Sequence, residues 1–189
     1  MRIVGGVFGG RILKTPKTGA LRPTQDRVRE ALFNIIRAEA EGADFLDLFA
    51  GSGAVGLEAL SRGASSVTFV EADRRHAETL RANVADIAGA AASRCTVAVA
   101  DAYRWVASYS GPGFSVAFAD PPYALGEAKG YAGFLAELAS RGVVRPGGVF
   151  VAEMTAVQKA EETPGWELLR DRKYGKTRIC IWTRKGETT

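Results

Sequence analysis

The sequence predicts an α/β fold with a mostly parallel sheet that ends in an antiparallel hairpin. Two observations carry this prediction. From Asp44 onward, short apolar runs typical of strands alternate with stretches of helical periodicity, and the connections between them are short. Near the C-terminus the alternation stops, and two strand-like runs, 166–171 and 178–183, are joined through a turn that contains Gly175.

The individual elements follow from local patterns. Strands are predicted for the apolar runs Phe45–Phe49, Val67–Val70, Thr96–Ala100, Ser115–Ala119 and Val149–Ala152. Helices are predicted at Val55–Arg62, Arg74–Ile87, Ala102–Ser108 and Tyr131–Arg141. A further helix is expected to begin at the N-cap Thr24, with Leu32 on its apolar face and Arg29 on its polar face.

Length and composition limit the classes of protein. A chain of 189 residues is expected to form a single domain with a substantial core. Its apolar runs are shorter than the roughly 20 residues that span a bilayer, and its N-terminus lacks a secretory apolar region, so a cytoplasmic protein is expected. One histidine, His76, and two distant cysteines, Cys95 and Cys180, argue against a zinc centre and against Ser/His/Asp catalysis.

The net charge of +4 is unevenly distributed along the chain. Residues 1–37 carry eight Lys/Arg and two Asp/Glu, residues 38–157 carry nine and fourteen, and residues 158–189 carry eight and five. Basic ends around an acidic middle favour a polyanion as an outer partner and a small polar or cationic ligand inside. Residues 1–40 are interpreted as a basic extension, a hairpin followed by a helix. The alternative is a solvated surface with chance clustering of charge.

A glycine-rich turn follows the first predicted strand. Asp47 lies in that strand, and the turn has the spacing Gly51-x-Gly53-x-x-Gly56 before a helix. Strand, glycine turn and helix are typical of the first unit of a nucleotide-binding fold, where the backbone can approach a ligand closely. The pattern fits a dinucleotide and S-adenosylmethionine alike, so it leaves the ligand open.

Acidic residues follow the next three strands, where ligands bind in an open α/β sheet. Glu71 ends the second strand, 20 residues after Gly51, and is placed to accept hydrogen bonds from ribose hydroxyls. Asp101 follows the third strand and Asp120 the fourth.

The motif Asp120-Pro121-Pro122-Tyr123 indicates the chemistry. The prolines remove two N–H donors, so the carboxylate and the neighbouring carbonyls make a site that only accepts hydrogen bonds. Such a site fits an exocyclic amino group, which offers two donors, and Tyr123 can stack on a base. The motif therefore favours an amino-group substrate.

With this motif, the sequence resembles the amino-group methyltransferases that use S-adenosylmethionine, whose patterns are D-x-F-x-G-x-G and (N/D)-P-P-Y. Further stretches resemble one bacterial family, the 16S ribosomal RNA guanine-N2 methyltransferases of the small-subunit methyltransferase D type. These stretches are Arg22-Pro23-Thr24, Arg29 to Asn34, Leu57 to Ala64 and Tyr174-Gly175-Lys176-Thr177. The resemblance covers nearly the whole chain and implies a Rossmann-like S-adenosylmethionine methyltransferase fold with seven strands.

The resemblance also implies roles for individual residues. The expected reaction is methyl transfer from S-adenosylmethionine to guanine N2 in 16S ribosomal RNA, within a small-subunit assembly particle and without a metal or a membrane. The implied cofactor-binding residues are Asp47, Phe49, Gly51, Gly53, Glu71, Asp101 and Ala102. The implied catalytic residues are Asp120 and Pro121, which would accept from the amino group, and Tyr123, which would stack on the flipped base. The implied RNA-contacting residues are Arg2, Arg11, Lys14, Lys17 and Arg22.

Other functions remain open at this point. A nicotinamide-dependent oxidoreductase would explain the glycine turn and Glu71, but not Asp120–Tyr123. An adenine-N6 methyltransferase acting on DNA or RNA shares the logic of an acceptor site. An RNA-binding assembly protein could keep an inactive methyltransferase core, although Asp120 and Glu71 are both present.

Overall fold

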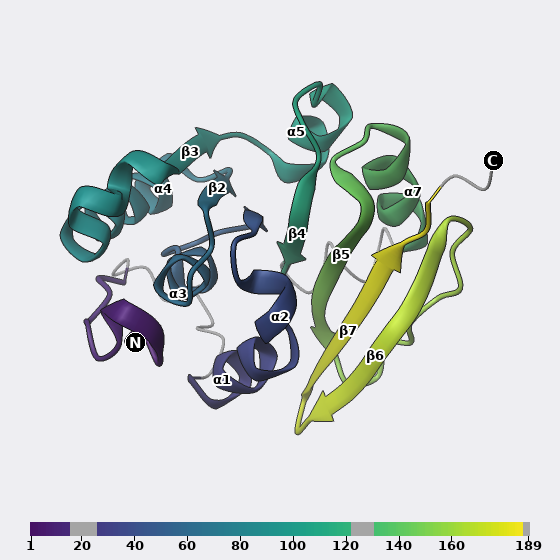
Figure 1. The fold of residues 1–189 in the computed structure, drawn as a ribbon, viewed down its shortest axis with the longest axis horizontal. Coiled ribbons are helices and arrows are strands. Elements are labelled where there is room, and N and C mark those ends of the chain that lie inside the picture. The colour runs from purple at the N-terminus through teal and green to yellow at the C-terminus, as the bar shows by residue number, and fades with distance from the viewer. Residues whose placement is uncertain (16–25, 122–130, 187–189) are drawn as a thin grey trace. The chain divides into compact units, whose positions relative to one another are not determined.

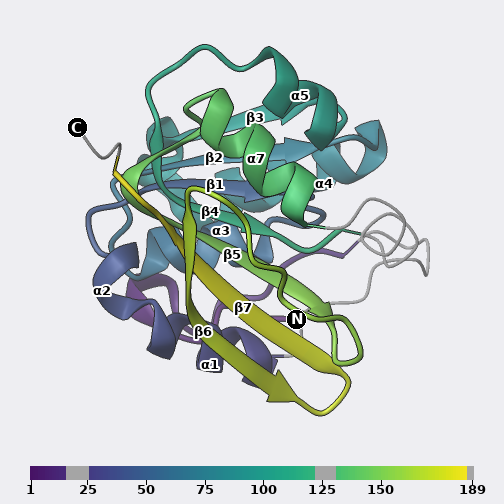
Figure 2. The same cartoon turned by 90° about the vertical axis from the view of Figure 1, so that its right-hand side faces the viewer.

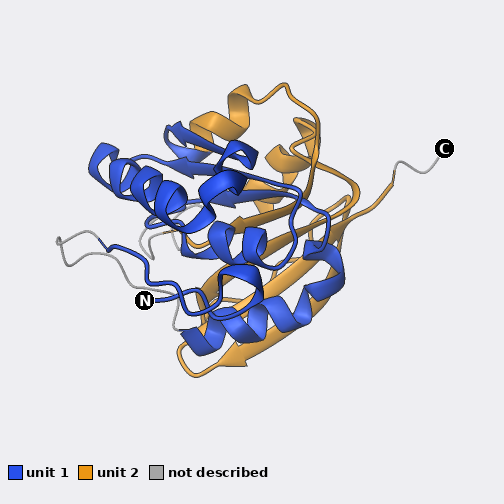
Figure 3. Cartoon of the chain, turned by 60° about the vertical axis from the view of Figure 1, so that its left-hand side comes forward, with its two compact units in different colours: residues 1–102 blue, residues 103–189 orange. Residues whose placement is uncertain are grey.

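The computed structural model describes residues 1–15, 26–121 and 131–186, which divide into two compact units. The first unit comprises residues 1–102 and the second residues 103–189 (Figure 3). In both units, each strand predicted for the sheet is found at or near its predicted position in the chain.

The first unit contains a three-stranded parallel sheet in the order β3-β2-β1 (Figure 1). Its strands are β1 (Asp44–Leu48), β2 (Ser66–Glu71) and β3 (Cys95–Val99). Its helices are α1 (Asp26–Ile35), α2 (Arg37–Ala40), α3 (Ala54–Ser61) and α4 (Arg74–Asn83). A π-helical turn (Val84–Ala88) and a 3-10 helix (Gly89–Arg94) lead from α4 to β3, and α5 (Ala102–Ser108) begins at the last residue of this unit.

Helix α3 is the central helix of the first unit, and all eight of its residues are buried. Apart from Glu58 and Ser61 its side chains are apolar, and such a helix must be covered on every side. The sheet covers one side, since α3 packs on β1 and β2, and the N-terminal segment with its 3-10 helix (Gly6–Phe8) packs on α3 as well.

The N-terminal segment folds back on itself, but it does not form the two strands that the sequence predicts. A single antiparallel bridge joins Arg2 and Ile12, with hydrogen bonds from Ile3 N to Arg11 O (2.9 Å) and from Leu13 N to Met1 O (3.1 Å). The 3-10 helix interrupts the pairing because the backbone there bonds instead to side chains of α3.

The second unit contains the strands β4 (Phe114–Ala119), β5 (Val144–Thr155), β6 (Trp166–Tyr174) and β7 (Thr177–Arg184), and the helix α7 (Ala132–Ser140). Their order is β4-β5-β7-β6; β4 and β5 are parallel, whereas β7 is antiparallel to both β5 and β6 (Figure 2). All six residues of β4 are buried, as expected for a parallel strand covered on both faces.

An aromatic cluster fills the core of the second unit. The ring of Phe150 lies 5.9 Å from that of Trp182, 6.0 Å from that of Phe134 and 6.3 Å from that of Trp166. The indole N–H of Trp166 donates to the carbonyl of Leu135 in α7 (2.9 Å), which fixes the hairpin to this helix.

The predicted fold class is confirmed: the described residues form a mixed α/β fold with seven strands, parallel except for the C-terminal antiparallel hairpin. None of the helices in the described ranges combines the length and the apolar character needed to cross a bilayer. The predicted N-cap Thr24 lies outside the described residues.

Candidate functional site

The glycine turn links β1 to α3 through an unusual backbone. Phe49 has a φ of 64°, the only positive value at a non-glycine residue in the described part of the chain. Gly51 (56°) and Gly53 (82°) also have positive φ, and Gly53 is the N-cap of α3. A bulky residue in the left-handed region costs on the order of 1–3 kcal/mol and tends to occur at functional sites. The turn is therefore strained at the position where the sequence predicts a ligand.

Two glycines of the turn are explained by packing inside the unit. A Cβ on Gly53 would lie 2.3 Å from Leu80 Cδ1, and a Cβ on Gly56 would lie 2.3 Å from Phe69 Cε1. These glycines let α3 approach β2 and α4 closely, so a ligand is not needed to explain them. Close ligand approach remains a prediction for Gly51 and Gly53.

Glu71 connects the turn to the end of β2. Its Oε2 accepts a hydrogen bond from Gly51 N (2.7 Å) and its Oε1 accepts from Asp73 N (2.8 Å), while His76 Nδ1 lies 3.8 Å from Oε1. A carboxylate has about four lone-pair sites, so each oxygen can accept one more hydrogen bond. The side chain is 11% exposed, which leaves it accessible to a ligand at this edge of the sheet.

Asp47 is 1% exposed and lies beneath the turn. Its Oδ2 accepts a hydrogen bond from Gly56 N (2.8 Å), in the first turn of α3, a helix whose N-cap Gly53 offers no side-chain acceptor. Burial raises the pKa of Asp47 to about 7, against the lowering effect of the Gly56 N–H, and the charge of Glu71 raises it further. Asp47 thus stabilises the start of α3; its contact with a ligand remains a prediction.

Asn83 is a site residue that the sequence analysis missed. Its Nδ2 donates to Ser52 O in the glycine turn (2.9 Å) and to Lys14 O (2.9 Å), and its Oδ1 accepts from Lys14 N (2.8 Å). The side chain is buried, so these bonds are made in a dry environment. One amide therefore holds both the glycine turn and the basic N-terminal segment.

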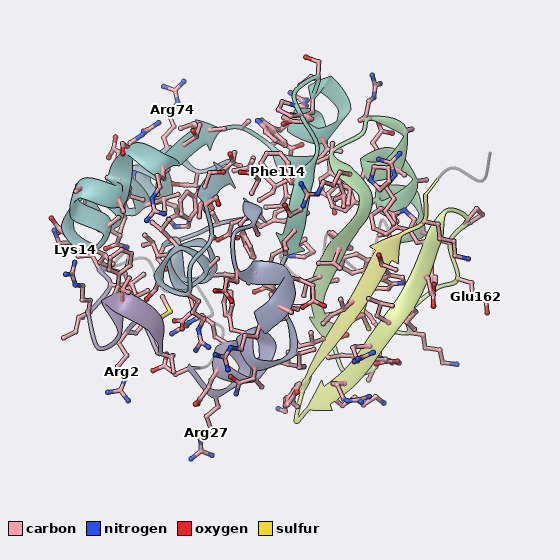
Figure 4. The ribbon with its side chains drawn as sticks, viewed as in Figure 1. Arg2, Lys14, Arg27, Arg74, Phe114 and Glu162 are labelled. Atoms are coloured by element: carbon pink, nitrogen blue, oxygen red, sulfur yellow. The ribbon has the colours of Figure 1, made fainter. Side chains whose placement is uncertain are left out.

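Three of the five predicted RNA-contacting cations lie in the described residues, and all three are exposed. Arg2 points away from the ribbon (Figure 4) and lies 3.9 Å from Asp26. The guanidinium of Arg11 donates to Ile87 O and lies 5.2 Å from the ring of Phe8, and Lys14 Nζ pairs with Asp86 at 2.5 Å. These exposed contacts leave the cations accessible to a polyanion. Lys17 and Arg22 lie outside the described residues.

Arg29 is buried, which corrects its predicted place on the polar face of the helix. Its side chain is 0% exposed, and its Nε lies 3.4 Å from Oε2 of Glu58, which is also 0% exposed. Glu58 further accepts from Val4 N (2.7 Å), Gly5 N (2.8 Å) and Arg62 Nε (2.7 Å). This buried ion-pair cluster fastens the N-terminal segment to α3. A lone acid within the apolar helix Ala54–Ser61 was the signal in the sequence that could have revealed it.

The predicted adenine-binding pair lies at the end of β3. Asp101 is exposed and Ala102, the first residue of α5, is buried. The first unit thus brings Asp47, Glu71 and the glycine turn together, because Glu71 bonds to Gly51 and Asp47 to Gly56. Among the described residues, no group of three His, Cys, Asp or Glu side chains could hold a metal ion.

The predicted catalytic motif begins at the carboxyl end of β4 in the second unit. Asp120 is partly exposed and Pro121 is buried; Tyr123 lies outside the described residues. Tyr131, at the start of α7, donates from its hydroxyl to Glu153 O (3.0 Å), and burial and the nearby charge of Asp120 raise its pKa. Tyr131 is therefore a fixed neutral neighbour of Asp120.

This fold, with a glycine turn after β1, an acid at the end of β2 and an Asp-Pro-Pro-Tyr motif after β4, defines the class of S-adenosylmethionine-dependent methyltransferases. The family model described as "Conserved hypothetical protein 95" matches residues 1–183, so the chain belongs to this family. The methyltransferase names of its relatives, given next, support S-adenosylmethionine as the cofactor.

Named relatives extend the comparison. "Ribosomal RNA small subunit methyltransferase D" of Escherichia coli is 43% identical over 126 residues, 67% of this chain and 62% of that protein. The protein of the same name from Haemophilus influenzae is 34% identical over 176 residues, covering 93% and 89% of the two chains. A solved structure titled "Putative methyltransferase yhhF from Escherichia coli" matches with a TM-score of 0.84 and 33% identity, and covers 98% of each chain.

Proposed function

We propose that the chain transfers a methyl group from S-adenosylmethionine to the exocyclic N2 amino group of a guanine in 16S ribosomal RNA. The observation that carries this proposal is the position of Asp120 and Pro121 directly after the buried strand β4. The names of the relatives, which act on ribosomal RNA of the small subunit, support the RNA class. The guanine target rests on the sequence resemblance.

The residues of the first unit fit the cofactor. Glu71 keeps free lone pairs on both carboxylate oxygens, as two ribose hydroxyls require, and the strained turn at Phe49 places backbone next to it. Asp47 offers a negative charge to an ammonium group, directly or through water. When bound, S-adenosylmethionine supplies a methyl group activated by its sulfonium.

Asp120 and the carbonyl of Pro121 are proposed to accept hydrogen bonds from the two N–H groups of the amino nitrogen. Guanine N2 is a weak nucleophile because its lone pair is delocalised into the ring. Two acceptors draw this nitrogen toward a pyramidal geometry and stabilise the positive charge it gains, as preorganised dipoles do in other enzymes. Once methylated, the nitrogen is acidic enough to lose its proton without a dedicated base.

Labelled S-adenosylmethionine tests the proposal directly. The protein is incubated with 16S ribosomal RNA and with small-subunit particles from cells that lack the enzyme, and the labelled nucleoside is mapped. We expect N2-methylguanosine, and a stronger signal on particles if assembly forms the substrate. Label in adenine, or in DNA supplied as a competitor, would refute the guanine assignment.

Two substitutions test the role of Asp120. Asp120→Ala should abolish methylation and leave the binding of S-adenosylhomocysteine unchanged, because Asp120 is proposed to touch only the amino group. Asp120→Asn keeps an acceptor oxygen and should retain part of the activity, since the wider group accepts Asn at this position. Full activity in Asp120→Ala would contradict the mechanism.

A further inference from the structure

The tip of the β6–β7 hairpin carries a concentrated positive charge that the proposed function leaves unexplained. Residues 170–178 contain five Lys/Arg and one Asp, a net charge of +4. The single acid, Asp171, accepts from Arg178 Nε (2.7 Å) and pairs with its Nη2, which holds the pKa of Asp171 below its usual value. The remaining four cations, which we call the basic tip, are exposed: Arg170, Arg172, Lys173 and Lys176.

The contacts of the basic tip leave its charge available. The guanidinium of Arg170 donates to Leu169 O (2.8 Å) and that of Arg172 to Asp171 O (3.0 Å), so each is held by the neighbouring carbonyl. Within the described ranges, Arg178 forms the hairpin's only salt bridge shorter than 4 Å. A carbonyl accepts a hydrogen bond without neutralising the cation.

The register of the strands places the basic tip level with the catalytic motif. Ala119, the last residue of β4, pairs with Ala152 in β5; Ala152 pairs with Cys180 in β7; and Cys180 pairs with Asp171 in β6. Asp120 follows Ala119 directly, and Arg170 and Arg172 flank Asp171. Three steps between strands of about 4.8 Å each amount to roughly 14 Å.

Lys173 and Lys176 lie further along the hairpin, beyond the carboxyl end of β4. This follows because Met154 pairs with Arg178 and Arg178 with Lys173. A distance of roughly 14 Å is about four nucleotides of a stacked strand at 3.4 Å per nucleotide. An RNA strand whose base meets Asp120 can therefore place its flanking phosphates on the basic tip.

The distribution of charge along the hairpin favours the binding of an anionic ligand over simple protection of an edge strand. Edge strands often carry Lys or Arg to prevent pairing with other chains. Here the two ends of the hairpin differ in net charge. Glu161, Glu162 and Glu167 lie with Arg184 and Lys185 at the end opposite the basic tip, where Glu162 points outward (Figure 4), so acids nearly balance cations there but not at the basic tip. Protection against edge pairing requires charge but no such separation.

We propose that the basic tip binds the phosphate backbone of the substrate RNA a few nucleotides from the target base. The inference rests on the proposed function, since it takes RNA as the polyanion. It adds a second RNA contact to the one expected for the N-terminal segment. The recognised chemistry is that of consecutive phosphates, so the contact is independent of sequence and sensitive to salt.

The test is a salt titration of RNA binding by the full-length protein. The probe is a fluorescent single-stranded RNA of about 30 nucleotides, and the tip variant is Arg172→Gln/Lys173→Gln/Lys176→Gln. Each phosphate contact contributes about 0.7 to the slope of log Kd against log salt for a single strand, so the slope should fall by about 2. The tip variant should bind about 100-fold more weakly at 0.1 M salt and approach the wild type near 1 M.

Two further variants control for total charge and for folding. Arg141→Gln/Arg145→Gln/Lys185→Gln also removes three exposed cations from the second unit, but near the start of β5 and the end of β7, away from Asp120. This control should keep nearly the wild-type slope. Arg172→Lys/Lys173→Arg/Lys176→Arg keeps the charges and should keep the slope as well.

The outcomes separate the possible explanations. A wild-type slope in the tip variant would overturn the inference. This holds even if the variant aggregates, because aggregation would show only that the cations protect the edge strand. A wild-type slope together with reduced methylation of particles would assign the tip to a ribosomal protein and would also overturn it. The slope requires no methylation, so a failure of the proposed function, seen as absence of N2-methylguanosine, is read separately.

Discussion

Replacing Asp47 by asparagine should remove a pH-dependent loss of stability. Asp47 is 1% exposed, and burial raises its pKa from 3.8 to about 7. The folded chain then binds the proton more tightly than the unfolded chain. Its stability therefore falls as the pH rises from about 4 to about 7, and the fall ends above the folded pKa. A shift of about three units at about 1.4 kcal/mol each corresponds to about 4 kcal/mol.

Urea unfolding of both proteins at pH 5 and pH 8 measures this effect. At pH 5 Asp47 is mostly neutral in the folded wild type, and the asparagine can still accept from Gly56 N, so the two proteins should differ little. At pH 8 the wild type contains a buried ionised carboxylate. The variant should therefore gain about 3 kcal/mol relative to the wild type between the two pH values.

Asp73→Asn is the matched control, because Asp73 caps α4 by accepting from Arg75 N and His76 N at an exposed site. These N–H groups lower the pKa of Asp73, so both pH values lie above its titration and the effect of the substitution should be constant. The reasoning about burial would be refuted if the free energies of unfolding of Asp47→Asn and the wild type also differed by a constant amount from pH 5 to pH 8.

The same titration tests the proposed contact between Asp47 and the cofactor. A nearby ammonium group favours the ionised carboxylate, so S-adenosylhomocysteine should displace a proton from wild-type Asp47 at pH 6. Calorimetry in buffers of different ionisation enthalpy should show release of close to one proton by the wild type and none by Asp47→Asn. Equal proton release by the wild type and Asp47→Asn would show that Asp47 bonds to α3 and does not contact the cofactor.

Three further predictions concern the contacts of the first unit. Glu58→Ala removes one of the partners of the buried Arg29, which keeps Asp26 and Arg2 O, and it also removes the acceptor of Val4 N and Gly5 N. It should cost about 3–5 kcal/mol in urea unfolding, with faster trypsin cleavage of the N-terminal segment than in the wild type. Gly53→Ala should destabilise more than Gly10→Ala, because both have similar positive φ but a Cβ on Gly10 would meet nothing within 4 Å; equal melting temperatures would contradict this. Asn83→Ala should weaken the binding of S-adenosylhomocysteine and of RNA together, as measured by calorimetry and fluorescence; a change in only one would argue against the shared contact.

The fold could be predicted from the sequence because each element has a strong local signal. Predicted Val55–Arg62 is found at Ala54–Ser61, and predicted Ala102–Ser108 is found with the same bounds. The main error in length is β5, predicted at Val149–Ala152 and found at Val144–Thr155. Its first residues include Pro146 and two glycines, which disfavour a strand locally, and pairing with its neighbours overrides that preference.

The binding and catalytic roles of the site residues stay predictions, and the contacts that support those residues could not be predicted from the sequence. Glu71 was found from its spacing to the glycine turn, and the structure shows the two in contact. Asn83 and Glu58 were missed because most of their partners lie 29 or more residues away in sequence, and periodicity carries no information about such pairs. Arg29 was misplaced because a charged residue in an amphipathic helix is usually exposed.

The ion-pair cluster around Glu58 has a consequence for the order in which the chain folds. Val4 and Gly5 bond to Glu58, and Lys14 bonds to Asn83, 69 residues later. The contacts that hold residues 4–14 on the first unit can therefore form only when Glu58 in α3 and Asn83 in α4 are themselves in place. Contacts so distant in sequence carry a large loop-closure cost, so this segment is expected to be among the last parts of the first unit to become ordered.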